Sequence, residues 1–241
     1  SQLLIVITEL QKPRRKIKWF LSLMKILDIY ERYDIMPNLA EHQLRVAAVA
    51  KYLCNHIQEK NFSEIDLVNA CLIHDMGNII KSDLSMFPDF ILPQMQPHYE
   101  EVKRKMAEKY ADEHVATLGI AQELGVNKEV LSYLKNARLF KYKTEQTDLA
   151  VKLYNYADMR VGPHGILTLQ NRLADLRARY EGRNKKEHSL PFDREAFEKR
   201  LHEFERDIFL VATCRPEDIT DQSIAPIIEK LRECDIQTLA S

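Results

Sequence analysis

Apolar residues recur along most of this chain at the 3.6-residue spacing that is typical of amphipathic helices. In the segment that begins near Pro37, for example, Val46, Val49, Leu53 and Ile57 fall on one helical face. The same spacing predicts further helices over residues 13–32, 63–81, 98–124, 127–140, 146–160, 168–182, 193–212 and 222–238. Six glycines and nine prolines leave few breaks between these segments. The pattern therefore predicts an all-α protein.

Two segments interrupt the helical pattern. Residues 3–8 form a short apolar run of the kind found in strands, but a single strand cannot make a sheet. Residues 82–97 contain three prolines and predict a loop that is long enough to face a substrate. Neither segment changes the expected fold class.

The composition limits the classes of protein to which this chain can belong. Its 35 Lys and Arg residues against 36 Asp and Glu give a net charge of −1, which argues against binding nucleic acid by bulk charge. The basic run 172–186 has interleaved acidic residues and is typical of a solvated helix face. No apolar run approaches the roughly 18 residues that cross a bilayer. We expect a soluble cytoplasmic protein without membrane or nucleic-acid partners, and assembly into a homo-oligomer stays open.

The most distinctive candidate chemistry is an adjacent histidine and aspartate inside an apolar helical segment. Residues 67–80 read LVNACLIHDMGNII, and His74 and Asp75 are the only imidazole and carboxylate in that run. Burial of a carboxylate is costly unless a partner or a metal ion compensates its charge. The pair is therefore either a structural hydrogen-bonded pair or part of a polar site.

Two residues on other predicted helices extend this polar set. His42 lies on the inward face of its own helix, and Asp158 lies near the end of the predicted helix 146–160. Taken singly, a core histidine and an aspartate near a helix end are ordinary features. With His74 and Asp75 they offer two imidazoles and two carboxylates, which suit Mn, Fe, Co, Ni or Zn. Helical bundles commonly build metal sites from such inward side chains, whereas the four cysteines form no C-x-x-C pair that could bind zinc.

The order of these residues along an all-α chain resembles the HD superfamily of metal-dependent phosphohydrolases. The string NLAEHQLRVAAVA around His42 is similar to the family's EHSLRVA helix, and CLIHDMGNI is similar to its LLHDIGK motif. The string YADMRV around Asp158 is similar to the segment that carries the family's final aspartate. The resemblance implies an HD-domain helical bundle in three parts: an N-terminal helical extension over 1–35, the HD domain over 36–165 and a C-terminal helical extension over 166–241.

The resemblance also implies a metal site and an activity. It implies that His42, His74, Asp75 and Asp158 bind one divalent transition metal, Mn, Fe, Co, Ni or Zn, with Mg as a further option. The implied enzyme is a phosphomonoesterase or nucleotidase, in which a metal-activated water cleaves the phosphate ester of a nucleotide or another small phosphorylated metabolite. Asp75 would also position that water.

A phosphate group at such a site needs positive or hydrogen-bonding side chains. Arg45 follows His42 by three residues and therefore projects from the same face of its helix. Lys81 lies at the end of the helix that carries the His–Asp pair, and Arg160 closely follows the last expected metal ligand. An exposed surface charge is the alternative for each of these three cations. His114 matches one of two further histidines in the family's dinuclear members, and we expect it to contact the phosphate or a second metal.

The chain departs from this family in ways that keep other functions open. The second extra histidine of the dinuclear members is absent near residues 135–140, although His98 lies upstream in the proline-rich region. Asn78 stands where one branch of the family usually carries Lys, and no Glu follows the HD pair at the spacing that some nucleotidases use for a general acid or base. The alternatives are a di-iron HD-type oxygenase, for which His98 and His114 are the remaining ligand candidates, and a non-catalytic nucleotide-sensing HD module.

Overall fold

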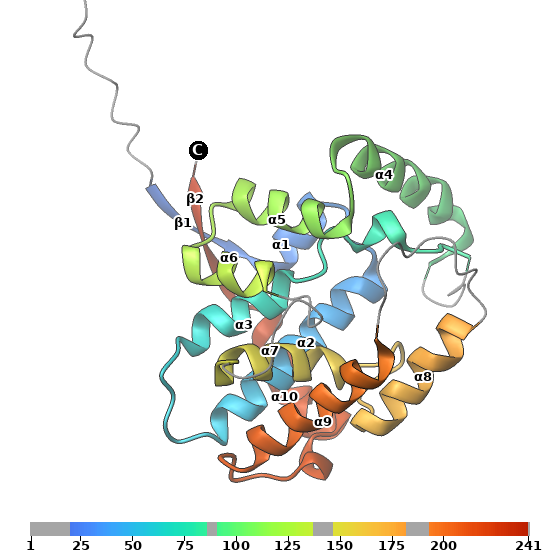
Figure 1. Cartoon of the computed structure of the whole chain (residues 1–241). Helices are drawn as coiled ribbons and strands as arrows, with labels where there is room; N and C mark the ends of the chain where they lie inside the picture. The colour runs from blue at the N-terminus through green and yellow to red at the C-terminus, as the bar shows by residue number, and fades with distance from the viewer. Residues whose placement is uncertain (1–19, 86–90, 137–146, 182–192, 241) are drawn as a thin grey trace, which may run out of the picture.

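The computed structural model describes residues 20–85, 91–136, 147–181 and 193–240, which form a bundle of α-helices (Figure 1). The α-helices are α1 (Ile26–Arg32), α2 (Pro37–Asn55), α3 (Glu64–Ile73), α4 (Gln96–Lys109), α5 (Glu113–Leu124), α6 (Lys128–Lys135), α7 (Leu149–Met159), α8 (Leu169–Glu181), α9 (Arg194–Phe209) and α10 (Asp221–Arg232). Short 3-10 helices occur at η1 (Asn78–Lys81), η2 (Pro93–Met95) and η5 (Pro216–Asp218). The expected all-α class is confirmed.

Helix α2 lies in the interior of the bundle, where it packs against α3, α7 and α10 (Figure 1). Every residue from 46 to 50 is buried, because three of these five are alanines whose small side chains let neighbouring helices approach closely. Pro37 suits the first turn of α2, since a proline lacks the N–H that would have no helical acceptor there. The central place of α2 brings His42, which lies near its start, beside the ends of α3 and α7.

The two ends of the described chain form a small sheet that the helical pattern did not predict. Strand β1 (Phe20–Lys25) pairs antiparallel with β2 (Asp235–Ala240), with Lys25 opposite Asp235 (Figure 1). The predicted helix 13–32 is therefore wrong over 20–25, and the predicted helix 222–238 ends at Arg232. Periodicity within one segment cannot show a strand partner that lies more than 200 residues away. The expected strand at 3–8 lies outside the described residues.

Three predicted helices also end earlier or divide. The predicted helix 63–81 stops at Ile73, and its last part is the 3-10 helix η1. The predicted helix 98–124 divides into α4 and α5, because Tyr110 is extended and the Asp112 carboxylate accepts a hydrogen bond from the Val115 N–H, which caps a new helix. Helix α6 ends at Lys135, and the rest of the segment predicted to 140 includes residues outside those described.

The C-terminal third shares one hydrophobic core with the helices that carry the HD motifs. Buried residues of α9 and α10, among them Leu201, Phe204 and Ile224, belong to the same cluster as Val49 of α2 and Ala157 of α7. An ion pair between Arg232 and Glu41, with Nη2 and Oε1 2.5 Å apart, also joins α10 to α2. The end of α7 is therefore enclosed by elements that come later in the chain.

Arg160, directly after α7, connects the end of that helix to the later elements through buried hydrogen bonds. Its side chain is fully buried, and Nε donates to the Leu167 carbonyl at 2.5 Å. Nη1 donates to the Tyr156 hydroxyl at 2.7 Å, and Nη2 donates to the carbonyls of Pro216 and Ile219 at 3.1 and 3.2 Å. The expectation that Arg160 binds phosphate is wrong, because its guanidinium lies in the interior and serves four protein acceptors.

Replacement of Arg160 by lysine should lower the free energy of unfolding by about 2–4 kcal/mol, because one ammonium group leaves several buried carbonyls without a donor. Urea denaturation of the purified variant measures this loss. Arg215→Lys is the matched control, since that arginine side chain is 78% exposed and its replacement should leave the denaturation midpoint unchanged. An Arg160→Lys variant as stable as the wild type would contradict the anchoring role.

Candidate metal centre

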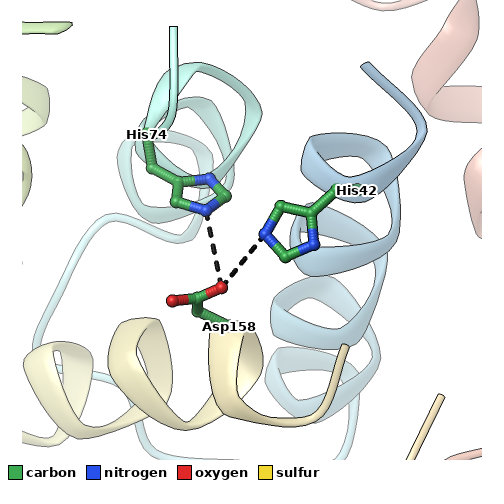
Figure 2. A group of neighbouring side chains, drawn as sticks. All are labelled: His42, His74 and Asp158. Atoms are coloured by element: carbon green, nitrogen blue, oxygen red, sulfur yellow. Dashed lines mark hydrogen bonds and ion pairs between the residues drawn. The ribbon is translucent and has the colours of Figure 1, made fainter. Parts of the chain in front are cut away.

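Three helices bring His42, His74 and Asp158 face to face (Figure 2). His42 comes from α2, His74 directly follows α3, and Asp158 lies in the last turn of α7. The His42 Nε2 atom is 3.1 Å from Asp158 Oδ1, and His74 Nε2 is 3.6 Å from the same oxygen. One donor atom from each residue lies within 4.8 Å of the other two, which is close enough for all three to bind one ion.

Asp75 also reaches this group. Its Oδ2 atom lies 3.7 Å from His42 Nε2 and 3.6 Å from His74 Nε2. Its side chain is 23% exposed, since α3 stops at Ile73 and Asp75 lies in the turn that follows rather than on a buried helical stripe. The structure thus brings together all four residues that were expected to form the site.

A hydrogen bond to the backbone orients the His74 ring so that its other nitrogen faces the carboxylates. Nδ1 lies 2.7 Å from the Cys71 carbonyl oxygen, which can only accept, so Nδ1 carries the hydrogen. In the neutral ring Nε2 then holds a free lone pair. That atom is buried and has no hydrogen-bond partner among the described residues. A buried imidazole nitrogen without a hydrogen-bond partner, 3.6 Å from a carboxylate oxygen of Asp75 and of Asp158, fits a metal ligand whose orientation is set by its other nitrogen.

The charges at the site are also consistent with a bound cation. Burial by itself would lower the pKa of His74, but the negative charges of Asp75 and Asp158 and its hydrogen bonds raise that pKa to about 9. Partial burial opposes ionisation of Asp158, but its contacts with His42 and His74 hold the pKa of its carboxyl well below the usual range. In the absence of a metal, a proton on His74 therefore neutralises part of the carboxylate charge.

The remaining residues that were expected at the site have different surroundings. Arg45 lies one turn after His42, is half-buried and has no ion pair within the described ranges. Lys81 is exposed and lies 3.4 Å from the Glu113 carboxylate. His114 is half-buried in the first turn of α5. His98 lies in the first turn of α4.

His98 is engaged away from the His–Asp group. Its Nε2 atom lies 3.1 Å from Asp34 Oδ1, and both side chains are largely exposed. The first turn of α5, by contrast, packs directly against the turn that carries Asp75. The approach is so close that a Cβ atom on Gly77 would lie only 2.2 Å from the Glu113 carbonyl oxygen. His114 therefore lies on the helix whose first turn contacts Gly77, whereas α4, which carries His98, packs against η1 further along the chain.

Gln43 is a further buried polar residue at the site that the sequence pattern did not single out. This side chain is fully buried, and its Oε1 accepts a hydrogen bond from the Asp75 N–H at 3.1 Å. The available signal was a glutamine directly after His42 and before the apolar run that begins at Leu44. A long polar side chain at a buried helical position requires a partner.

The fold and this cluster define an all-α protein with a His–His–Asp group that could hold a metal ion. Residues 20–119 match the family described as 5'-deoxynucleotidase YfbR-like, which is an HD-domain family. The resemblance to the HD superfamily is thereby confirmed, and the match supports nucleotide phosphohydrolase activity at the level of the family. The matched segment contains His42, His74 and Asp75, whereas Asp158 lies beyond it.

Other comparisons add no relative. No curated protein and no solved structure matches the chain. None of the described helices combines the length and the hydropathy that crossing a bilayer requires.

Purified protein incubated with Mn²⁺ or Co²⁺ should retain one ion per chain after dialysis, and Asp158→Asn should weaken that binding by more than about 100-fold. The reason is that loss of an outer-shell group alone typically costs 10–100-fold in metal affinity. At pH 7, binding should release about one proton, because the pKa of His74 is about 9 and its Nε2 must be deprotonated to bind the ion.

Elemental analysis measures the stoichiometry, and calorimetry in buffers of different ionisation enthalpy measures the proton release. His98→Ala is the matched control, since it removes a histidine that contacts Asp34 instead of the cluster. Equal metal affinity of wild type and Asp158→Asn would contradict the assignment.

Proposed function

We propose that this protein is a metal-dependent phosphomonoesterase that removes the 5'-phosphate of a nucleoside monophosphate, with deoxynucleotides as the first substrates to test. The observation that carries the proposal is the convergence of His42, His74 and Asp158, joined by Asp75, in a chain whose residues 20–119 match a deoxynucleotidase-type HD family. Three of these four residues lie in the matched segment.

In this proposal His42, His74, Asp75 and Asp158 hold one divalent first-row metal ion. The donor set of two imidazoles and two carboxylates suits Mn, Fe, Co, Ni or Zn. When bound, the ion supplies a Lewis acid that lowers the pKa of a water molecule towards about 7 and polarises a phosphoryl oxygen.

Asp75 has a second task, which is to orient the attacking water. One of its oxygens faces the two imidazoles, and the side chain is partly exposed in the turn after α3. The second oxygen can therefore accept a hydrogen bond from the water. In the reaction the water oxygen bonds to phosphorus, the ester P–O bond breaks, and one proton of the water ends on the leaving nucleoside oxygen.

Arg45 and His114 are the proposed phosphate contacts. Arg45 follows His42 on the same helical face, and within the described part of the chain it has no ion pair that a phosphate would have to displace. His114 lies in the first turn of α5, which packs on Gly77 two residues after Asp75. Lys81 supports the proposal less, because it is exposed and lies near Glu113.

The two alternative functions have less support. A di-iron oxygenase needs two irons and six ligands, and His98 is engaged with Asp34. A sensing module without turnover would use the same cluster for binding only.

Phosphate release should be observed with a panel of deoxynucleoside 5'-monophosphates in the presence of Mn²⁺ or Co²⁺, and EDTA should abolish it. Asp75→Asn should lower kcat by at least about 100-fold, because it loses a charged ligand and the group that orients the water. Inorganic phosphate is the measured product, and ribonucleotides and 3'-monophosphates define the specificity.

Asp148→Asn is the matched control, since Asp148 is exposed at the opposite end of α7, and this variant should retain wild-type kcat. Unchanged turnover in Asp75→Asn would contradict the mechanism. Saturable nucleotide binding without product would favour the sensing module, and two irons per chain with oxygen consumption would favour the oxygenase.

A further inference from the structure

At the end of α3, side chains donate hydrogen bonds to the carbonyls that a longer helix would also use. In a continuing helix the Asp75 N–H would donate to the Cys71 carbonyl, and the Met76 N–H to the Leu72 carbonyl. Here the Cys71 carbonyl accepts from His74 Nδ1 at 2.7 Å, and the Leu72 carbonyl accepts from the Tyr30 hydroxyl at 2.6 Å. Because α3 ends at Ile73, the Asp75 N–H lies outside the helix and bonds to a partner on another element.

Gln43 supplies that partner from the neighbouring helix. Its Oε1 accepts the Asp75 N–H at 3.1 Å, and its Nε2 lies 4.0 Å from the Met76 sulfur. The side chain is fully buried, so the hydrogen bond is shielded from water. Because Gln43 directly follows His42 on α2, this bond joins the backbone that carries one candidate ligand to the backbone of another.

A second side chain holds the other end of residues 74–77, which we call the HD turn. The Gly77 N–H donates to Thr117 Oγ1 at 2.9 Å, and the Thr117 hydroxyl donates to the Glu113 carbonyl at 3.0 Å. Thr117 is buried on α5. The HD turn is thus fixed from α2 through Gln43 and from α5 through Thr117, and of these two bonds the one from Gln43 is made by the Asp75 backbone.

We propose that Gln43 is a positioning residue that holds Asp75 in its metal-binding and water-orienting place through the Asp75 N–H. This proposal rests on the proposed function of the His–Asp cluster. Gln43 itself reaches the Asp75 backbone and the Met76 sulfur rather than the carboxylates. Without this acceptor the Asp75 backbone keeps its bond from the Asn78 N–H within the turn, but the carboxylate is held less firmly at its distance from His42 and His74.

The Gln43→Met variant removes the acceptor with little change in side-chain volume. Its affinity for Mn²⁺ should fall about 10–100-fold, the usual effect of losing a group that orients a ligand. We expect kcat to fall by a similar factor while KM for the nucleotide stays within about twofold, because Gln43 does not contact the phosphate. In the metal-free protein, amide hydrogen exchange at Asp75 should accelerate at least about tenfold because its N–H has lost its buried acceptor.

Thr117→Val is the comparison variant, because it removes the analogous buried acceptor from the Gly77 N–H. Its metal affinity should fall less than that of Gln43→Met when the two variants have similar denaturation midpoints. The positioning role would be overturned if the loss of metal affinity were explained, in both variants alike, by the drop in denaturation midpoint. An unchanged rate of amide hydrogen exchange at Asp75 in Gln43→Met would also overturn it. Wild-type protein that binds no divalent metal would overturn the proposed function and this role together, whereas a failed Gln43 effect with intact wild-type binding overturns this role alone.

Discussion

The early end of α3 is the constraint on which the rest of the site depends. If the helix continued through residue 81, Asp75 would stay on a helical face instead of in a turn beside His42. The carbonyls at the end of the helix accept hydrogen bonds from His74 and Tyr30, and the bond from His74 Nδ1 leaves its Nε2 facing the carboxylates. One hydrogen bond to Cys71, at the last turn of the helix, therefore orients a candidate ligand.

The other half of the cluster depends on the C-terminal part of the chain. Asp158 lies beyond the segment that matches the nucleotidase family, and its helix ends at Met159, directly before the buried Arg160. The guanidinium of Arg160 joins this end to the carbonyls of Pro216 and Ile219. The residues after 165, which sequence reasoning treated as an extension, thus enclose the helix that carries Asp158.

The balance of charge explains why the four residues can lie so close together. Two carboxylates that share two imidazoles would repel each other in a partly buried site unless a positive charge lies between them. A proton on His74 provides part of that charge in the metal-free chain, and the raised pKa of His74 reflects this arrangement. A divalent cation in the same place would compensate both carboxylates, which is the physical basis of the proposed phosphoesterase.

The sequence by itself determined the all-α class, most of the helices and the four residues of the cluster, because helical periodicity and isolated ionisable groups in apolar runs are local signals. It did not determine the pairing of β1 with β2 or the end of α3 at Ile73, since both depend on partners far away in the chain. Tertiary structure alone decided that Arg160 is an internal anchor and that Gln43 contacts Asp75. The reason is that a polar side chain has the same appearance in a sequence whether it faces solvent or a buried backbone group. Only the packing of the helices determines whether the side chain is exposed to solvent or bonded to a buried backbone group.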